Sequence, residues 1–203
     1  MRFAETTFRP LFGRILAVVI GVLGVAGTVA TAVTVDPLSA LRVAAPTGLV
    51  VVLVFAAYWF PKVAVRDEEI EVRNVFTTFH VPWAAIRRID TKWSLTLVTD
   101  TAKVIAWASP APGRHATFWM TRGDVRATRD SARAAEGSIR PGDSLESESG
   151  AAAHVIRTHW EQLRDDDQLD PPGTGTGARR ELHVPTIVAT VALAGATVLS
   201  LLL

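Results

Sequence analysis

Residues Ile15–Val35 read ILAVVIGVLGVAGTVATAVTV and contain no charged side chain. A helix needs about 20 apolar residues to cross the hydrocarbon core of a bilayer, so this stretch is long enough to span one. Two more uncharged apolar stretches follow, Val43–Phe60 and Val184–Leu203. The sequence therefore predicts three transmembrane helices: an N-terminal hairpin within residues 1–60 and a C-terminal span at 184–203.

The ends of the hairpin carry signals typical of membrane helices. Asp36-Pro37 is a helix stop between the two spans, and Pro46 falls in the first turn of the second span, where a missing N–H is tolerated. Tyr58-Trp59-Phe60 forms an aromatic cluster suited to the membrane interface. A cleavable signal peptide is the alternative for the first span, but its apolar run is longer than a typical signal and a second span follows closely.

Positive charge predicts the orientation of the spans. Arginines at positions 2, 9 and 14 precede the first span, and only Arg42 lies in the short connection between the first two. Basic residues also flank the soluble part: Lys62, Arg66, Arg73, Arg179 and Arg180. The positive-inside rule then places the N-terminus and the soluble domain in the cytoplasm and the C-terminus outside. We expect a multi-pass membrane protein.

Between the spans, residues 61–168 form the predicted soluble domain, and its first part, from Lys62 to Trp107, alternates apolar and polar side chains with a period of two. The predicted strands contain Val63 and Val65, Ile70 and Val72, Thr77–Val81, Ile86–Thr91, Ser94–Thr99 and Lys103–Trp107. Short strands at spacings near ten residues, joined by tight turns, indicate an antiparallel sandwich or a small barrel.

One amphipathic helix follows this strand-rich part. Ala152, Ile156, Trp160 and Leu163 recur at helical spacing and predict a buried stripe, which would plug the open end of a barrel. Residues 109–148, between the strands and this helix, are expected to form an irregular insertion. Residues 169–183, which include Gly173–Gly177, are expected to be a flexible linker to the last span.

The order of these parts resembles the actinobacterial membrane proteins that carry a bacterial pleckstrin-homology-like (PH) domain. The stretches that carry the resemblance are Val72–Asn74, His80–Ile86, Trp93–Asp100, Ala106–Arg114 and Ser149–Ala152. The resemblance implies a seven-stranded, partly open antiparallel barrel capped by the C-terminal α-helix. It implies no catalytic residue, because members of the family mostly lack an assigned activity.

Few residue patterns in the chain point to catalysis or to a cofactor. The chain has no cysteine, which excludes disulfides, thiolate catalysis and cysteine-based zinc sites. His154 and His159 lie five residues apart, which does not align them on one helix face for a metal. No serine lies in a nucleophile elbow, and the net charge of +1 gives no field for nucleic acid. We expect no enzyme activity, cofactor, metal, nucleic-acid partner or small-molecule substrate.

The predicted surface for a lipid or protein partner is the basic cluster Arg87, Arg88 and Lys92. A second basic segment, Arg122–Arg140, carries arginines at helical spacing, although solvated surface residues are the simpler interpretation of both sets. Two functions stay open: a membrane-tethered module that binds a protein, for instance by strand addition, and a module that binds anionic lipid headgroups. Five tryptophans of the soluble domain belong to its core or rim, and one or two of them could line a binding face: Trp83, Trp93, Trp107, Trp119 and Trp160.

Overall fold

The computed structural model describes residues 5–110, 148–166, 169 and 177–202, and they divide into two compact units. The first unit holds the described residues of 1–9, Lys62–Asn74 and Thr78–Glu181. The second holds those of Pro10–Pro61, Val75–Thr77 and Leu182–Leu203. The two units are described separately below.

The second unit consists of long apolar helices. They are α1 (Leu11–Thr34), α2 (Pro37–Val54), which continues into a π-helical turn (Phe55–Trp59), and α5 (Val184–Leu202). Among the described residues, these three helices are long and apolar enough to cross a membrane.

The first helix has different bounds from the predicted span, Ile15–Val35. It begins at Leu11, directly after Pro10. The charge of Arg14 ended the predicted apolar run, but a charged side chain does not prevent the backbone hydrogen bonds of a helix, so the helix includes Arg14 and the residues just before it. The helix ends at Thr34 rather than Val35. Val35 has φ −112° and ψ −83°, outside the helical region, and its N–H closes the last turn by donating to the carbonyl of Thr31 at 3.0 Å.

The second helix also begins before its predicted span, Val43–Phe60. The reason is a cap: the Asp36 carboxylate accepts a hydrogen bond from the Ser39 N–H at 2.8 Å, which starts the helix at Pro37 regardless of hydropathy. Its π-helical end stops at Trp59, one residue before Phe60. The third helix begins at Val184 as predicted, and Leu203 lies outside the described residues.

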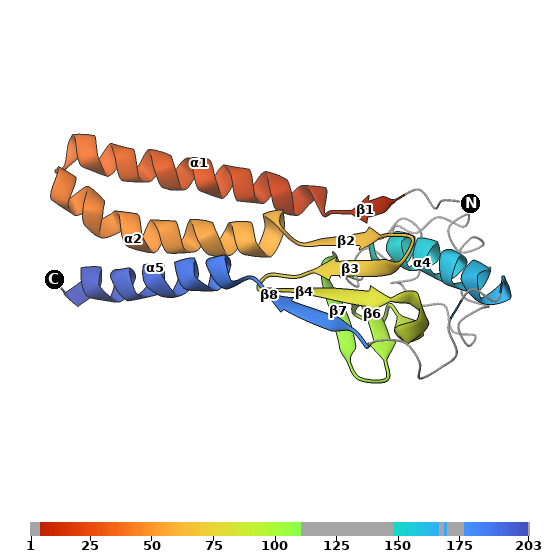
Figure 1. The fold of residues 1–203 in the computed structure, drawn as a ribbon. Coiled ribbons are helices and arrows are strands. Elements are labelled where there is room, and N and C mark those ends of the chain that lie inside the picture. The colour runs from red at the N-terminus through yellow and green to blue at the C-terminus, as the bar shows by residue number, and fades with distance from the viewer. Residues whose placement is uncertain (1–4, 111–147, 167–168, 170–176, 203) are drawn as a thin grey trace. The chain divides into compact units, whose positions relative to one another are not determined.

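Helix α2 lies between α1 and α5 and packs against both (Figure 1). Small residues permit the close approach, as is common between membrane helices. A Cβ at Gly24 of α1 would lie 2.9 Å from Cγ2 of Thr47 and 3.0 Å from Cγ2 of Val51 on α2. On the other side of α2, Gly48 faces Leu193 of α5.

A five-stranded sheet has the order β1-β2-β3-β4-β8 and is antiparallel from β1 to β4; it belongs to the first unit except for its terminal residues Thr77 and Leu182. Its strands are β1 (Thr6–Phe8), β2 (Lys62–Val65), β3 (Glu69–Arg73), β4 (Thr77–Pro82) and β8 (Arg179–Leu182). The central three strands lie where the alternation predicted them. The two edge strands were not predicted: β1 lies in the expected N-terminal hairpin, and β8 occupies the end of the expected 169–183 linker. Their backbones pair with neighbours already in place, so a short edge strand needs little apolar alternation of its own.

A second, three-stranded antiparallel sheet contains β5 (Ile86–Asp90), β6 (Ser94–Thr99) and β7 (Lys103–Pro110). A single 3₁₀ turn, Trp83–Ala85, connects it to β4. The pairing register shifts between Ile86 and Arg88 and again between Ser94 and Thr96. Such bulges bend strands and increase their twist.

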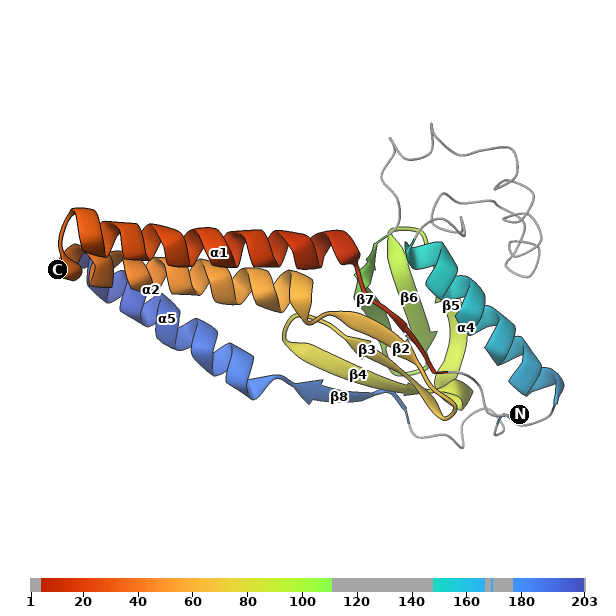
Figure 2. The same ribbon diagram turned by 90° about the horizontal axis from the view of Figure 1, so that it is seen from above.

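The core of this unit combines residues of both sheets with helix α4 (Glu148–Asp165), which packs against β5, β6 and β7 (Figure 2). Ala152 and Ile156 are fully buried, and Trp160 and Leu163 pack against the same core, which confirms the predicted stripe. The structure thus contains antiparallel sheets and helices, as predicted. Closure of the two sheets into a seven-stranded, partly open barrel that α4 caps stays a prediction.

Candidate interaction surface

Arg87, the first residue of the predicted basic cluster, is engaged by a neighbouring carboxylate. Its Nε and Nη2 donate to the two oxygens of Asp100 at 2.9 and 2.6 Å. This two-pronged hydrogen bond raises the pKa of Arg87 and lowers the pKa of Asp100, against the opposing effect of desolvation. A phosphate or acidic partner would have to displace Asp100 before it could use both donors of Arg87.

Arg88 and Lys92 lie at different places along the same sheet. Arg88 is exposed and stands opposite Val98 on β6, whereas Lys92 lies in the turn after β5. At roughly 3.3 Å per residue, Arg87 lies about 10 Å from the end of β5 at Asp90, and Lys92 lies beyond that end, in the turn. The structure therefore does not gather Arg87, Arg88 and Lys92 into one pocket.

Lys92 belongs instead to an aromatic corner of the β5–β6 turn. Its Nζ lies 5.6 Å from the ring centroid of Trp93, and Trp93 is 76% exposed. An exposed tryptophan beside a lysine is typical of residues that meet a membrane surface or a partner.

The outer face of β7 carries exposed apolar side chains and lies outside the predicted basic cluster of Arg87, Arg88 and Lys92. Lys103, Ile105 and Trp107 alternate with buried residues, and Ile105 and Trp107 are 51% and 55% exposed. Residues directly opposite in a ladder share a face, so Val98 and Thr96 of β6 lie beside Lys103 and Ile105 on it. We call Lys103, Ile105 and Trp107 the β7 face. The sequence signal for it was the alternation in 103–107, in which the larger side chains occupy the exposed positions and valine and alanine the buried ones.

The backbone beneath the β7 face is held by Asn74. The Asn74 side-chain amide donates to the carbonyl of Ile105 at 2.8 Å, and its oxygen accepts from the N–H of Trp107 at 2.8 Å. One amide thereby pairs with both backbone groups as a neighbouring strand would. The exposed side chains of β7 consequently stand on a fixed backbone.

The five-stranded sheet carries an ionic network around Glu71, which is only 8% exposed. Glu71 accepts from Lys62 at 2.8 Å and from Arg66 at 2.6 Å, and Arg66 also contacts Glu5 at 2.9 Å. Burial raises the pKa of Glu71, but the hydrogen bond from Lys62 and the charges of Lys62, Arg66 and His80 outweigh it, so the pKa is lowered. The network links the residue before β1 to β2 and β3.

His80 continues this network toward β8. Its Nδ1 lies 2.6 Å from Glu69, and its Nε2 lies 3.7 Å from Glu181 of β8. Arg179, also on β8, lies 3.5 Å from Glu181. The contacts of His80 join β4, β3 and β8 and account for a histidine that the sequence left as a packed or edge residue.

A second histidine, His159 of α4, packs edge-on against Trp83 with ring centroids 4.8 Å apart. Burial lowers the pKa of His159, against a smaller raising effect of its hydrogen bond with Gln162 and the charge of Asp67. A lowered pKa favours the neutral ring, which suits packing against Trp83. Among the described residues, no group of three His, Asp or Glu side chains is arranged to hold a metal ion.

A small pocket of about 170 Å³ lies beside Arg87, lined also by Ala85, Thr99, Asp100 and Gly177. Typical small-molecule sites are larger, about 300–1,000 Å³. The predicted basic segment Arg122–Arg140, Trp119 and most of the predicted insertion 109–148 lie outside the described residues.

Residues 60–142 match the bacterial PH domain family. The match begins just before β2 and ends before α4, and it supports a bacterial PH-like domain in this part of the chain. No curated protein and no solved structure matches the chain. The PH-like domain thus contains both the predicted basic cluster and the β7 face.

Proposed function

We propose that this chain is a non-enzymatic, multi-pass membrane protein that presents its PH-like domain at the cytoplasmic face to bind a protein partner. The observation that carries the proposal is the β7 face, where two large apolar side chains, Ile105 and Trp107, are each about half exposed. Tryptophan is among the residues that contribute most to binding energy at protein interfaces.

Membrane anchoring is supported by three helices that are apolar and long enough to span a bilayer. The sheet supports the sidedness as well. β1, before the first span, pairs with β2, after the second, so both strands must lie on one side of the membrane. β8, before the third span, belongs to the same sheet. This arrangement fits a cytoplasmic N-terminus and PH-like domain, with the C-terminus outside, as the distribution of arginines favours.

The proposed contact uses side chains rather than strand addition along the part of β7 that Asn74 holds. Asn74 already pairs with the carbonyl of Ile105 and the N–H of Trp107, so an added strand would have to displace it. A partner that buried Ile105 and Trp107 would instead remove apolar area from water and leave the two Asn74 hydrogen bonds in place.

The second candidate is a lipid-binding module that uses Arg87, Arg88 and the Arg122–Arg140 segment. It is favoured by the exposed pair Lys92 and Trp93 and by the exposure of Arg88. Against it stands the pairing of Arg87 with Asp100. The charge available to lipid heads on the described part of β5 is then mainly that of Arg88.

Site-specific photocrosslinking in intact cells tests the proposal. A photoreactive residue at position 105 or 107 is expected to yield a discrete protein adduct. The matched control is position 101, an exposed residue in the β6–β7 turn outside the β7 face. Protein adducts of equal yield at all three positions, or adducts with lipid alone at 105 and 107, would reject the proposed function.

A further inference from the structure

The end of the helical hairpin that leads into the PH-like domain contains a cation without a matching anion in its unit. Arg14, on the first turn of α1, is half-buried, and its Nε is buried with no hydrogen-bond acceptor among the described residues. The second unit holds one carboxylate side chain, that of Asp36. Asp36 follows the other end of α1, about 33 Å from Arg14 at 1.5 Å per residue.

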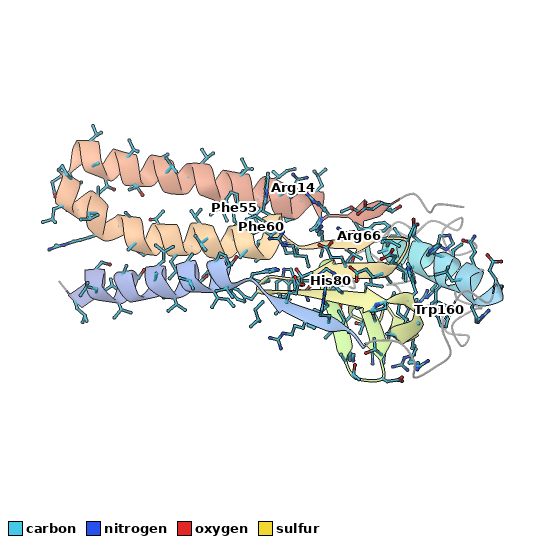
Figure 3. All side chains as sticks on the ribbon, in the orientation of Figure 1. Arg14, Phe55, Phe60, Arg66, His80 and Trp160 are labelled. Atoms are coloured by element: carbon cyan, nitrogen blue, oxygen red, sulfur yellow. The ribbon has the colours of Figure 1, made fainter. Side chains whose placement is uncertain are left out.

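The contact that Arg14 does make is aromatic. Its guanidinium carbon lies 4.5 Å from the ring centroid of Trp59, at the end of α2. Figure 3 shows Arg14 beside the part of the chain that carries Phe55 and Phe60. A ring on one side leaves the in-plane N–H donors of a guanidinium available for an oxygen ligand.

The π-helical turn contributes to this contact. The Phe60 N–H donates to the carbonyl of Phe55 at 3.2 Å, a span of five residues where an α-helix has four. One extra residue turns the side chains that follow by about 100° around the axis. The turn is also tightly packed against α1, because a Cβ at Gly13 would lie 3.1 Å from Cδ1 of Tyr58. Such turns within helices occur frequently at functional sites.

We propose that Arg14 and Trp59 form a binding site for the phosphate of one phospholipid. Arginine binds phosphate oxygens through two parallel N–H donors, which would supply the acceptor that Nε of Arg14 lacks. Trp59, with the exposed rings of Tyr58 and Phe60 beside it, provides the aromatic environment found at the level of the headgroups. The inference rests on the proposed membrane position of the helices, which brings lipid phosphates to the level of Arg14.

The test uses the full chain in detergent, with bound lipid measured by native mass spectrometry. The probes are phosphatidylglycerol and a phosphate-free diglucosyl diacylglycerol with the same acyl chains. Phosphatidylglycerol is expected to remain bound one per chain, and the glycolipid is expected to dissociate. Arg14→Gln is expected to weaken phosphatidylglycerol binding at least about tenfold, and Trp59→Leu by a smaller factor. Arg14→Lys keeps the charge but not the planar pair of donors, and it is expected to fall between wild type and Arg14→Gln.

The matched control is Arg42→Gln, which removes the other arginine of the helical unit from the far end of the hairpin. It is expected to leave phosphatidylglycerol binding within about twofold of wild type, since the proposed stack is not altered. Circular dichroism and thermal melting establish whether each variant is folded. If Arg14→Gln does not fold, Arg14→Lys still tests the site.

Three results would overturn the inference: unchanged binding in the arginine variants, equal retention of the glycolipid, or displacement of the lipid by millimolar inorganic phosphate. The last would make soluble phosphate the ligand. Alkaline extraction of membranes checks the proposed function separately. Release of the chain into the soluble fraction would reject its membrane position, whereas a retained chain that shows any of the three results rejects only the lipid site.

Discussion

The carboxylate of Glu71 lies 2.6 Å from the guanidinium of Arg66, across the turn that joins β2 to β3. The same carboxylate lies 2.8 Å from Lys62, so a nearly buried anion is held by two cations of one neighbouring segment. Arg66 in turn reaches Glu5, next to β1. This relationship ties an edge strand of the sheet to its central strands.

We predict that Glu71→Gln lowers the free energy of unfolding by about 2–4 kcal/mol, because Lys62 and Arg66 would lose the charge that compensates them. Chemical denaturation of the full chain in detergent, followed by tryptophan fluorescence, measures the change. Glu68→Gln, at an exposed position in the adjacent turn, is the control and should shift stability by less than about 0.5 kcal/mol. Equal effects of the two changes would contradict the role given to Glu71.

The same carboxylate predicts a pH dependence. The pKa of Glu71 is lowered from 4.5 in the folded protein, so near that pH the unfolded chain binds more protons than the folded one. The stabilisation is therefore complete above pH 4.5 and is lost as the pH falls through the lower folded value. Denaturation between pH 3 and 7 should show a shallower decline for Glu71→Gln than for wild type. Parallel curves would assign the acid sensitivity to other groups.

A pair of glycines on α1 tests the packing of α1 against α2. Gly24→Ala should destabilise the helical unit by about 1–3 kcal/mol, since its Cβ would meet Thr47 and Val51 at 2.9 and 3.0 Å. Gly27→Ala is the matched control, because nothing lies within 4 Å of its added Cβ. Thermal melting in detergent compares the two. A Gly27→Ala protein as unstable as Gly24→Ala would show that the helix backbone, rather than the α1–α2 contact, is sensitive.

Arg87 is paired with Asp100 whereas Arg88 is exposed, so the two arginines of the predicted cluster are expected to contribute differently to lipid binding. In nanodiscs with anionic lipid, Arg88→Gln should reduce lipid-dependent protection of β5 from hydrogen exchange. Arg87→Gln should have a smaller effect, because Asp100 already occupies both of its donors. Asp100→Asn should increase the protection by removing the competing charge. A larger effect of Arg87→Gln than of Arg88→Gln would reject this ranking.

The β7 face predicts a substitution that affects binding without unfolding the domain. Trp107→Ser should abolish the expected photocrosslink from position 105 while leaving the melting temperature within about 3 °C of wild type, because the ring is more than half exposed. Trp83→Ser is the contrast. Trp83 is 4% exposed and donates to the carbonyl of Arg66 at 3.0 Å, so its loss should destabilise the domain by about 3–5 kcal/mol. A strongly destabilised Trp107→Ser would make this residue part of the core.

The amino-acid sequence by itself determined the apolar helices, the central strands and the buried stripe of α4. Each is visible as a local pattern in the sequence: an uncharged run such as Ile15–Val35, the alternation around Ile70 and Val72, and the helical spacing from Ala152 to Ile156. Periodicity persists in the fold because burial acts on every residue of one face. The bacterial PH-like domain, first inferred from short stretches, is supported at residues 60–142.

Only the tertiary structure decided where helices end, which charges are available and which strands close the sheet. The first helix runs from Leu11 to Thr34 because backbone hydrogen bonds, and not hydropathy, set its ends. Arg87 and Arg88 are adjacent in sequence, yet Arg87 is paired with Asp100 and Arg88 is exposed. β1 and β8 became strands because β2 and β4 offered them backbone partners distant in the chain. Hydrogen bonds and ion pairs between distant segments depend on geometry in three dimensions, which no local period of the sequence records.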